Sequence, residues 1–144
     1  YITAVGAKEI FQYPIFGQLI TLYGGVPIIR THLKSALKSL QYVEEAINKG
    51  VSFIIAPEGT RTLTGELSPF KKGPFHLAKN TGITIVPIAL MGGLEAKSKD
   101  DWRLKPGILT TRFGVPITQE EYGHLQVEEI SDLVREKIED LIKA

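Results

Sequence analysis

Residues 51–61 read VSFIIAPEGTR, an apolar run that ends at a proline and is followed by polar side chains. A run of β-branched and aromatic residues that stops at Pro and Gly is typical of a buried strand with an abrupt end. The next residues have the groups that hold a phosphate: Arg61 is a bidentate donor, Thr60 has a hydroxyl, and Gly59 lets backbone N–H groups approach an anion. Glu58 cannot contact a phosphate favourably, so we expect its carboxylate to orient the Arg61 guanidinium. Ligands of open α/β sheets bind outside the carboxyl ends of the strands, where this loop would lie.

The rest of the chain alternates strand and helix patterns. Pro27 predicts an edge or irregular strand, and Thr31 is positioned to cap the helix that follows it. The apolar run at 83–90 is typical of a strand covered on both faces. The patterns predict strands at 2–5, 26–29, 51–56, 83–90 and 108–113, and helices at 15–23, 31–49, 73–81 and 127–141. This order predicts an α/β fold in a single domain, with a mostly parallel or mixed central sheet flanked by helices.

Composition narrows the class of protein. The 144 residues are 43% hydrophobic, which suits one compact domain with its own core. A net charge of +1 argues against a nucleic-acid partner. The chain has no Cys, which excludes disulfides and Cys-based metal sites, and its His and carboxylates form no cluster that predicts a metal site. No apolar run reaches the roughly 18 residues of a membrane-spanning helix.

Further sequence blocks accompany the loop in a fixed order. Downstream stand PFKKGPFH at 69–76 and IVPI at 85–88; upstream stand VGAKEI at 5–10, YPIFGQ at 13–18 and GVPIIR at 25–30. From about residue 5 to about residue 92, these blocks resemble the glycerolipid acyltransferase family. The branch they resemble most is that of the 1-acyl-sn-glycerol-3-phosphate (lysophosphatidic acid) acyltransferases. EGTR alone would be weak evidence, whereas several blocks in order are specific.

The resemblance implies an enzyme that transfers a fatty acyl group from acyl-CoA or an acyl carrier protein to the free hydroxyl of a lysophospholipid, converting lysophosphatidic acid to phosphatidic acid. It implies direct transfer by general-base catalysis, with no cofactor and no metal. The expected partners are these substrates, a carrier protein and a membrane surface. The expected substrate-binding residues are Lys8, Arg30, Glu58, Gly59, Thr60 and Arg61. Alternatively, Arg30 is a surface residue at a strand end and Lys8 pairs with Glu9 at a helix start.

The family's catalytic block is a His followed five residues later by an Asp, and it precedes the blocks quoted above. The three histidines of this chain are His32, His76 and His124. Five residues after them stand Leu37, Thr81 and Glu129. No catalytic residue is therefore assigned within the chain. We expect residues 1–144 to be the C-terminal portion of an acyltransferase domain, with the His/Asp block upstream of Tyr1 and an N-terminal anchor on the cytoplasmic side of a membrane.

Three charged side chains near the loop have simpler interpretations. Lys71 and Lys72 are typical of a solvated loop pair, although they can also face anionic lipid headgroups. His76 lies near a predicted helix start, where the positive end of the helix dipole disfavours protonation, and we expect it to be a bystander rather than a base. The apolar residues Pro69, Phe70 and Phe75 are expected to pack the loop onto the core.

Other functions remain open on the sequence. A non-catalytic phospholipid-headgroup binding module would keep the phosphate-binding residues without the His, and an acyltransferase could use another glycerol-phosphate acceptor. A His-x4-Asp motif in the encoding gene would favour the enzymes. A nucleotide-binding domain would need a Gly-rich phosphate loop after the first strand, where this chain has Gly6-Ala7-Lys8-Glu9.

Overall fold

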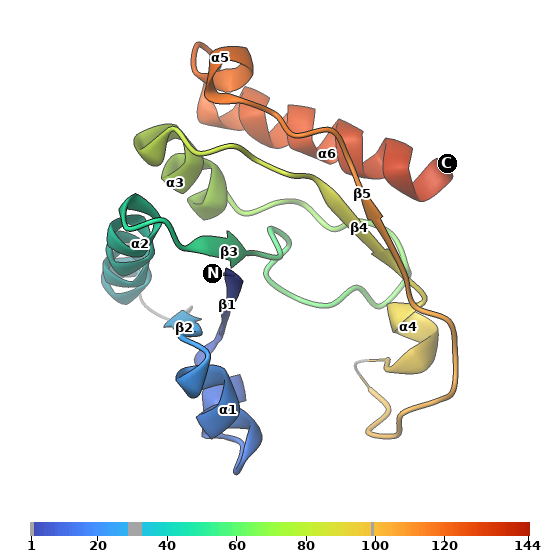
Figure 1. The fold of residues 1–144 in the computed structure, drawn as a ribbon. Helices are drawn as coiled ribbons and strands as arrows, with labels where there is room; N and C mark the ends of the chain where they lie inside the picture. The colour runs from blue at the N-terminus through green and yellow to red at the C-terminus, as the bar shows by residue number, and fades with distance from the viewer. Residues whose placement is uncertain (1, 29–32, 99) are drawn as a thin grey trace. The chain divides into compact units, whose positions relative to one another are not determined.

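The computed structural model describes residues 2–28, 33–98 and 100–144. The chain forms two compact units, with unit 1 at Tyr1–Ala56 and unit 2 at Pro57–Ala144. Each unit has its own hydrogen-bonded sheet (Figure 1).

Unit 1 is built on a three-stranded parallel sheet of order β2-β1-β3. The strands are β1 (Ile2–Ala7), β2 (Val26–Ile28) and β3 (Ser52–Ile54). β1 pairs with β2 from Val5 opposite Val26, and with β3 from Ile2 opposite Ser52. Pro27 therefore lies on an edge strand, as its missing N–H predicts.

The helices of unit 1 connect these parallel strands. They are the 3₁₀ helix η1 (Lys8–Gln12), α1 (Phe16–Leu22) and α2 (Leu33–Asn48). α2 packs against β2, and its Val43 is fully buried, in agreement with the predicted apolar face. η1 begins at Lys8, as the alternative interpretation of that residue expected, but its extent was not predicted, because a short 3₁₀ helix does not show a hydrophobic period. The expected cap Thr31 lies outside the described residues.

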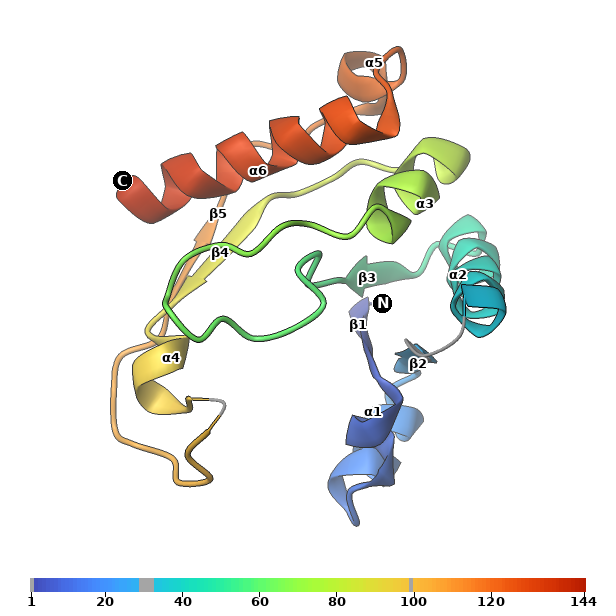
Figure 2. The same ribbon diagram turned by 180° about the vertical axis from the view of Figure 1, so that it is seen from behind.

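Unit 2 combines an antiparallel strand pair with helices. Its elements are α3 (Gly73–Thr81), β4 (Ile88–Met91), α4 (Gly93–Ala96), β5 (Thr110–Phe113), α5 (Gln119–Tyr122) and α6 (Val127–Lys143). β4 and β5 pair with Ile88 opposite Phe113, and an isolated bridge between Ile85 and Ile117 extends the contact. α6 lies along β4 and β5 and also contacts α3 (Figure 2).

The core of unit 2 is gathered around Tyr122. Its hydroxyl oxygen lies 3.0 Å from the Ala78 carbonyl oxygen and 2.6 Å from that of Ile83, so one O–H joins α5 to the end of α3. At the start of α6, the backbone N–H of Gln126 donates to Glu129 Oε2. This bond gives a partner to an N–H group that the helix itself leaves unpaired. The buried residues of the core are Phe75, Ala78, Ala89, Ile117, Tyr122, Val127, Ile130, Val134 and Ile138.

The predicted α/β class is confirmed, with two differences in detail. Hydrogen bonding places the described strands in two sheets rather than in one central sheet. The segment 83–90 is not covered on both faces: Pro87 and Ala89 are buried, but Val86 and Leu90 are 44% and 65% exposed. The uniform apolar run therefore hid the alternation of a half-covered strand. In the part of the chain that the structure describes, no helix has the length and apolar character needed to cross a bilayer.

Candidate functional site

The EGTR motif lies in a loop of unit 2, residues 57–72, which we call the EGTR loop (light green in Figure 1). The backbone N–H of Lys71 donates to the carbonyl oxygen of Pro57 at 2.8 Å, so the two ends of the loop are joined. At the tip, the Thr62 hydroxyl oxygen accepts the N–H groups of Thr64 and Gly65 at 3.2 and 3.0 Å. Loops with joined ends and internal contacts are compact and frequently functional. The motif is thus held in an ordered loop that has no helix or strand.

Arg61 is the residue of this loop best suited to bind an anion. Its side chain is exposed, and within the described residues its guanidinium has no ion-pair or hydrogen-bond partner. An anion therefore does not have to displace an internal carboxylate to reach the guanidinium. The neighbouring Thr60 hydroxyl reaches only the Arg61 carbonyl oxygen, at 3.5 Å, which is the long limit of a hydrogen bond. Both groups are open to a ligand.

The backbone conformation at position 59 favours a glycine, although there is space for a side chain. The φ of Gly59 is 71°, in the left-handed region that a side chain disfavours. A Cβ at this position would lie 3.5 Å from Lys71 Cγ, which is an ordinary contact. The same contact shows that the Lys71 side chain packs alongside Gly59, so an exposed lysine lies beside the motif.

Glu58 does not hold Arg61, contrary to the expectation from the sequence. The ion pairs of the described residues include none between these two side chains. Instead, Glu58 Oε2 accepts the backbone N–H of Ser68 at 2.8 Å. The carboxylate closes the loop on itself and does not pair with the Arg61 guanidinium.

Lys72 forms a surface ion pair with Glu128 of α6, with Nζ 2.5 Å from Oε1. The hydrogen bond from Lys72 lowers the pKa of the Glu128 carboxyl below its usual value, and a hydrogen bond to its backbone adds to this effect. Both side chains are exposed, so the pair contributes little to stability. The Lys72 ammonium is therefore paired with a residue of α6, whereas the Lys71 side chain is exposed to solvent.

The two remaining predicted substrate-binding residues belong to unit 1. Lys8 is exposed and begins η1, directly after β1. Arg30 lies outside the described residues. The convergence of Lys8 and Arg30 with Arg61 on one phosphate remains a prediction.

The two histidines that the structure describes, His76 and His124, form no hydrogen bond or ion pair with the EGTR motif. His76 is exposed on α3 and His124 is exposed after α5, while His32 lies outside the described residues. Among the described His, Asp and Glu residues, no three are grouped so that they could hold a metal ion.

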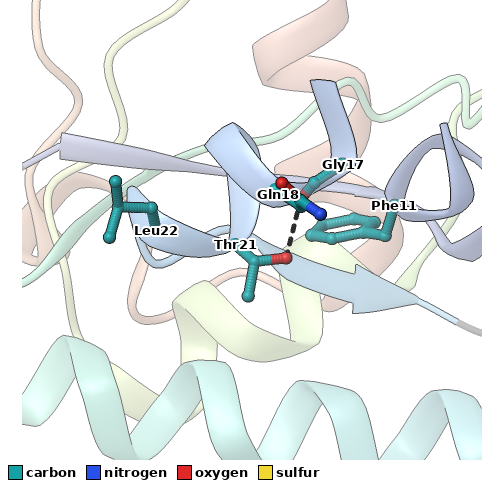
Figure 3. Close-up of a pocket in the computed structure, with 5 residues that line it drawn as sticks. All are labelled: Phe11, Gly17, Gln18, Thr21 and Leu22. Atoms are coloured by element: carbon teal, nitrogen blue, oxygen red, sulfur yellow. Dashed lines mark hydrogen bonds between the residues drawn. The ribbon is translucent and has the colours of Figure 1, made fainter. Parts of the chain in front are cut away.

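A cavity in unit 1 is lined by other residues than these. It has a volume of about 570 Å³ and is lined by Phe11, Gly17, Gln18, Thr21 and Leu22 (Figure 3). The Thr21 hydroxyl points to the Gly17 carbonyl oxygen and donates to it at 2.8 Å. None of the predicted substrate-binding residues lines this cavity, so the geometry of the candidate site rests on the EGTR loop.

Two residues that hold this loop were missed by the sequence analysis. Ser68 supplies the N–H that Glu58 accepts, and Arg135 of α6 donates to the carbonyl oxygens of Leu67 and Ser68 at 2.9 Å each. The contact between Ser68 and Glu58 joins residues ten positions apart, and the contact between Arg135 and Ser68 joins residues 67 positions apart. A backbone group gives no sequence signal, and Arg135 four residues before Glu139 reads only as a surface ion pair on a helix.

The sequence profile of the family described as Acyltransferase matches residues 1–91. Among curated relatives, the 1-acyl-sn-glycerol-3-phosphate acyltransferase of Cocos nucifera is 37% identical over 90% of this chain and 42% of its own length. The enzyme of the same name from Salmonella typhimurium is 33% identical over 96% of this chain and 58% of its own. In Brassica napus, the chloroplastic 1-acyl-sn-glycerol-3-phosphate acyltransferase BAT2 is 43% identical over 61% of this chain and 26% of its own.

The solved structure of the 1-acyl-sn-glycerophosphate (LPA) acyltransferase PlsC from Thermotoga maritima superposes with a TM-score of 0.82 at 23% identity. The match covers 98% of this chain and 55% of the other, which shows a shared fold. The chain thus spans 42% of the Cocos nucifera relative and 55% of the Thermotoga maritima structure.

Proposed function

This chain belongs to the acyltransferase family, and we propose that it supplies the acceptor-binding part of an enzyme that acylates lysophosphatidic acid to phosphatidic acid. Curated relatives that match most of this chain have the name 1-acyl-sn-glycerol-3-phosphate acyltransferase, which supports this acceptor. The EGTR loop offers the chemistry that a phosphate monoester requires.

The observation that carries the proposal is the exposed guanidinium of Arg61, which has no ion-pair or hydrogen-bond partner among the residues that the structure describes. An Arg fork binds two phosphate oxygens in one plane, the nearby Thr60 hydroxyl is a further donor, and Gly59 lets the anion approach the backbone closely. Lys71, packed beside Gly59, adds positive charge at the same place. In this proposal Lys8 and Arg30 complete the set of phosphate contacts.

These residues act by positioning the acceptor. When its phosphate is held, the free hydroxyl of the glycerol is oriented toward the thioester carbonyl of acyl-CoA or of an acyl carrier protein. A base removes the hydroxyl proton, the hydroxyl oxygen forms the new ester bond to the carbonyl carbon, and the C–S bond breaks, so that the sulfur takes up the proton and leaves as a thiol. Orientation of this kind lowers barriers by about 7–11 kcal/mol in favourable cases. The His-x4-Asp base that the family resemblance implies is not encoded within residues 1–144, so proton transfer is not assigned to this chain.

We further propose that the protein works at a membrane surface, on its cytoplasmic side, because the acceptor and the product are amphiphiles. Exposed apolar side chains of unit 1 support this location. Around α1 they include Tyr13, Phe16, Leu19 and Leu22, the last of which is 80% exposed. Large exposed apolar side chains that occur together are typical of a protein or membrane interaction site.

The proposal is tested with Arg61→Lys in the protein as its gene encodes it. Lysine keeps the charge but loses the fork, so kcat/KM for lysophosphatidic acid should fall about 10- to 100-fold, as expected for the loss of a charged hydrogen bond. The KM for acyl-CoA should stay within about twofold. Arg103→Lys is the matched control, since Arg103 is an exposed arginine of the same unit that is bonded to Asp101. Near-normal kcat/KM in Arg61→Lys would refute the phosphate-binding role.

A headgroup-binding module without catalysis is the second candidate, since no His-x4-Asp spacing occurs in these residues. It predicts that the gene-encoded protein binds lysophosphatidic acid and shows no turnover with either acyl-CoA or acyl carrier protein. Turnover with either donor excludes this candidate and identifies the donor.

A further inference from the structure

Arg135 of α6 uses all three nitrogens of its guanidinium on neighbouring groups. Nη1 donates to the Ser68 carbonyl oxygen and Nη2 to that of Leu67, both at 2.9 Å. Nε donates to Glu139 at 2.9 Å, and the guanidinium carbon lies 5.4 Å from the centre of the Phe70 ring. Three donors and one face of the same group are thus engaged at once.

These contacts hold the EGTR loop where it has no regular secondary structure. The Phe70 ring stacks on Phe75 of α3 at 6.1 Å, so the loop is fixed between α6 and α3. Carbonyl groups of a loop need donors from elsewhere in the fold, and a planar fork can serve two consecutive carbonyls at once. A lysine ammonium cannot reproduce this geometry.

Ser68 connects Arg135 to the EGTR motif. Its carbonyl oxygen accepts from Arg135, and its N–H donates to Glu58, three residues before Arg61. The connection therefore runs from α6 through Arg135, Ser68 and Glu58 to the backbone that carries Arg61. Within the described residues, the Arg61 guanidinium has no side-chain partner of its own, so its direction depends on this backbone.

We propose that Arg135 is a positioning residue, which orients the EGTR loop so that Arg61 meets the acceptor phosphate; this rests on the proposed function above. Arg135 does not itself touch the acceptor. Its loss should weaken acceptor binding while the fold and the acyl donor site are kept.

The test compares Arg135→Lys with Arg112→Lys in the gene-encoded protein. Arg112 is a matched control, because it donates to the Leu141 carbonyl oxygen near the C-terminal end of α6 and has no contact with the loop among those described. In Arg135→Lys, the KM for lysophosphatidic acid should rise about tenfold and the KM for the acyl donor should change less than about twofold. Amide hydrogen exchange should become faster in residues 57–72 of Arg135→Lys, and stay unchanged there in Arg112→Lys.

A double-mutant cycle separates positioning from general destabilisation. If Arg135 acts through Arg61, adding Arg135→Lys to Arg61→Lys should raise the KM for lysophosphatidic acid by less than about twofold further. Fully additive effects would overturn the inference, as would an Arg135→Lys variant that behaves like Arg112→Lys.

The outcomes also distinguish this inference from the proposed function. If Arg61→Lys leaves the KM for lysophosphatidic acid unchanged, the proposed function fails. If Arg61→Lys raises this KM and Arg135→Lys leaves it unchanged, only the inference fails. Should Arg135→Lys not fold, Arg135→Gln retains one amide donor for a loop carbonyl and takes its place. Failure of both variants to fold would overturn the inference, because Arg135 would then be required for the fold itself.

Discussion

The Glu58 carboxylate accepts the backbone N–H of Ser68 at 2.8 Å, across ten positions of the same loop. A carboxylate two to three residues from an arginine is usually interpreted as its ion-pair partner, and here it has another task. By closing the loop, Glu58 fixes the backbone on both sides of Arg61 and leaves the guanidinium available to a phosphate. The role of Glu58 is thus to shape the loop, and its substitution should affect the phosphate contact indirectly.

Two substitutions at Glu58 should therefore differ in strength. Glu58→Gln keeps an oxygen that can accept from Ser68, and kcat/KM for lysophosphatidic acid should fall less than about fivefold. Glu58→Ala leaves the Ser68 N–H without a partner, at a cost of about 1–3 kcal/mol, and the fall should exceed about tenfold. Steady-state kinetics of both variants check this order. Equal losses would point to a role for the charge, as in a direct pair with Arg61.

Gly59→Ala should damage acceptor binding through the backbone. The φ of 71° at Gly59 forces a side chain into the left-handed region, at a cost of about 1–2 kcal/mol. Gly50→Ala is the control, because Gly50 has a φ of 86° with no atom within 4 Å of the added Cβ. Both variants should lose similar stability in thermal unfolding, and only Gly59→Ala should raise the KM for lysophosphatidic acid. A raised KM in both would mean that the effect is general.

His76→Ala should leave kcat within about twofold of the unchanged protein, because the side chain is exposed on α3 and no catalytic partner is assigned to it. The measurement is the pH profile of kcat in the gene-encoded protein, with His124→Ala as a second exposed histidine for comparison. Loss of turnover in His76→Ala alone would make His76 the base and would reverse our assignment.

Tyr122→Phe should destabilise unit 2 by about 1–3 kcal/mol, since the Ile83 carbonyl oxygen loses this donor, whereas the Ala78 carbonyl oxygen keeps the N–H of Gly82. Burial raises the pKa of the Tyr122 hydroxyl. Because this pKa is raised in the folded state, the contribution of the Tyr122 hydroxyl to the free energy of unfolding is fully present below the unfolded pKa of about 10. That contribution is lost as the pH rises through the folded pKa. Denaturant unfolding at pH 8 and pH 11 should show a smaller difference between the variants at pH 11. A difference that grows with pH would contradict this sign.

Binding to anionic vesicles should be sensitive to salt if exposed lysines make the main contact. Lys71 is exposed, whereas Lys72 already pairs with Glu128, so Lys71→Ala should weaken sedimentation with vesicles more than Lys72→Ala does. Exposed charges more than about 10 Å apart are largely screened at 0.1 M salt. Binding that persists unchanged at high salt would instead make the apolar side chains around α1 the main contact.

The alternation of strands and helices, the edge position of Pro27 and the apolar face of α6 could all be read from the sequence, because they follow from local periodicity and from a missing N–H. The EGTR motif could be identified as a phosphate-binding candidate in the same way, because Arg, Thr and Gly have this chemistry wherever they stand. Local signals of this kind need no knowledge of distant residues.

The partner of Glu58, the anchoring of the loop by Arg135 and the exposure of Val86 and Leu90 could not be read in this way. Glu58 contacts a backbone group ten positions away, and Arg135 contacts a backbone group 67 positions away. Backbone groups are the same in nearly every residue, so the sequence does not indicate which of them a side chain will contact. The exposure of a strand face depends on what packs against it, and an unbroken apolar run looks the same whether one face is covered or two. Long-range packing and backbone hydrogen bonds settle these features, and they exist only once the chain has folded.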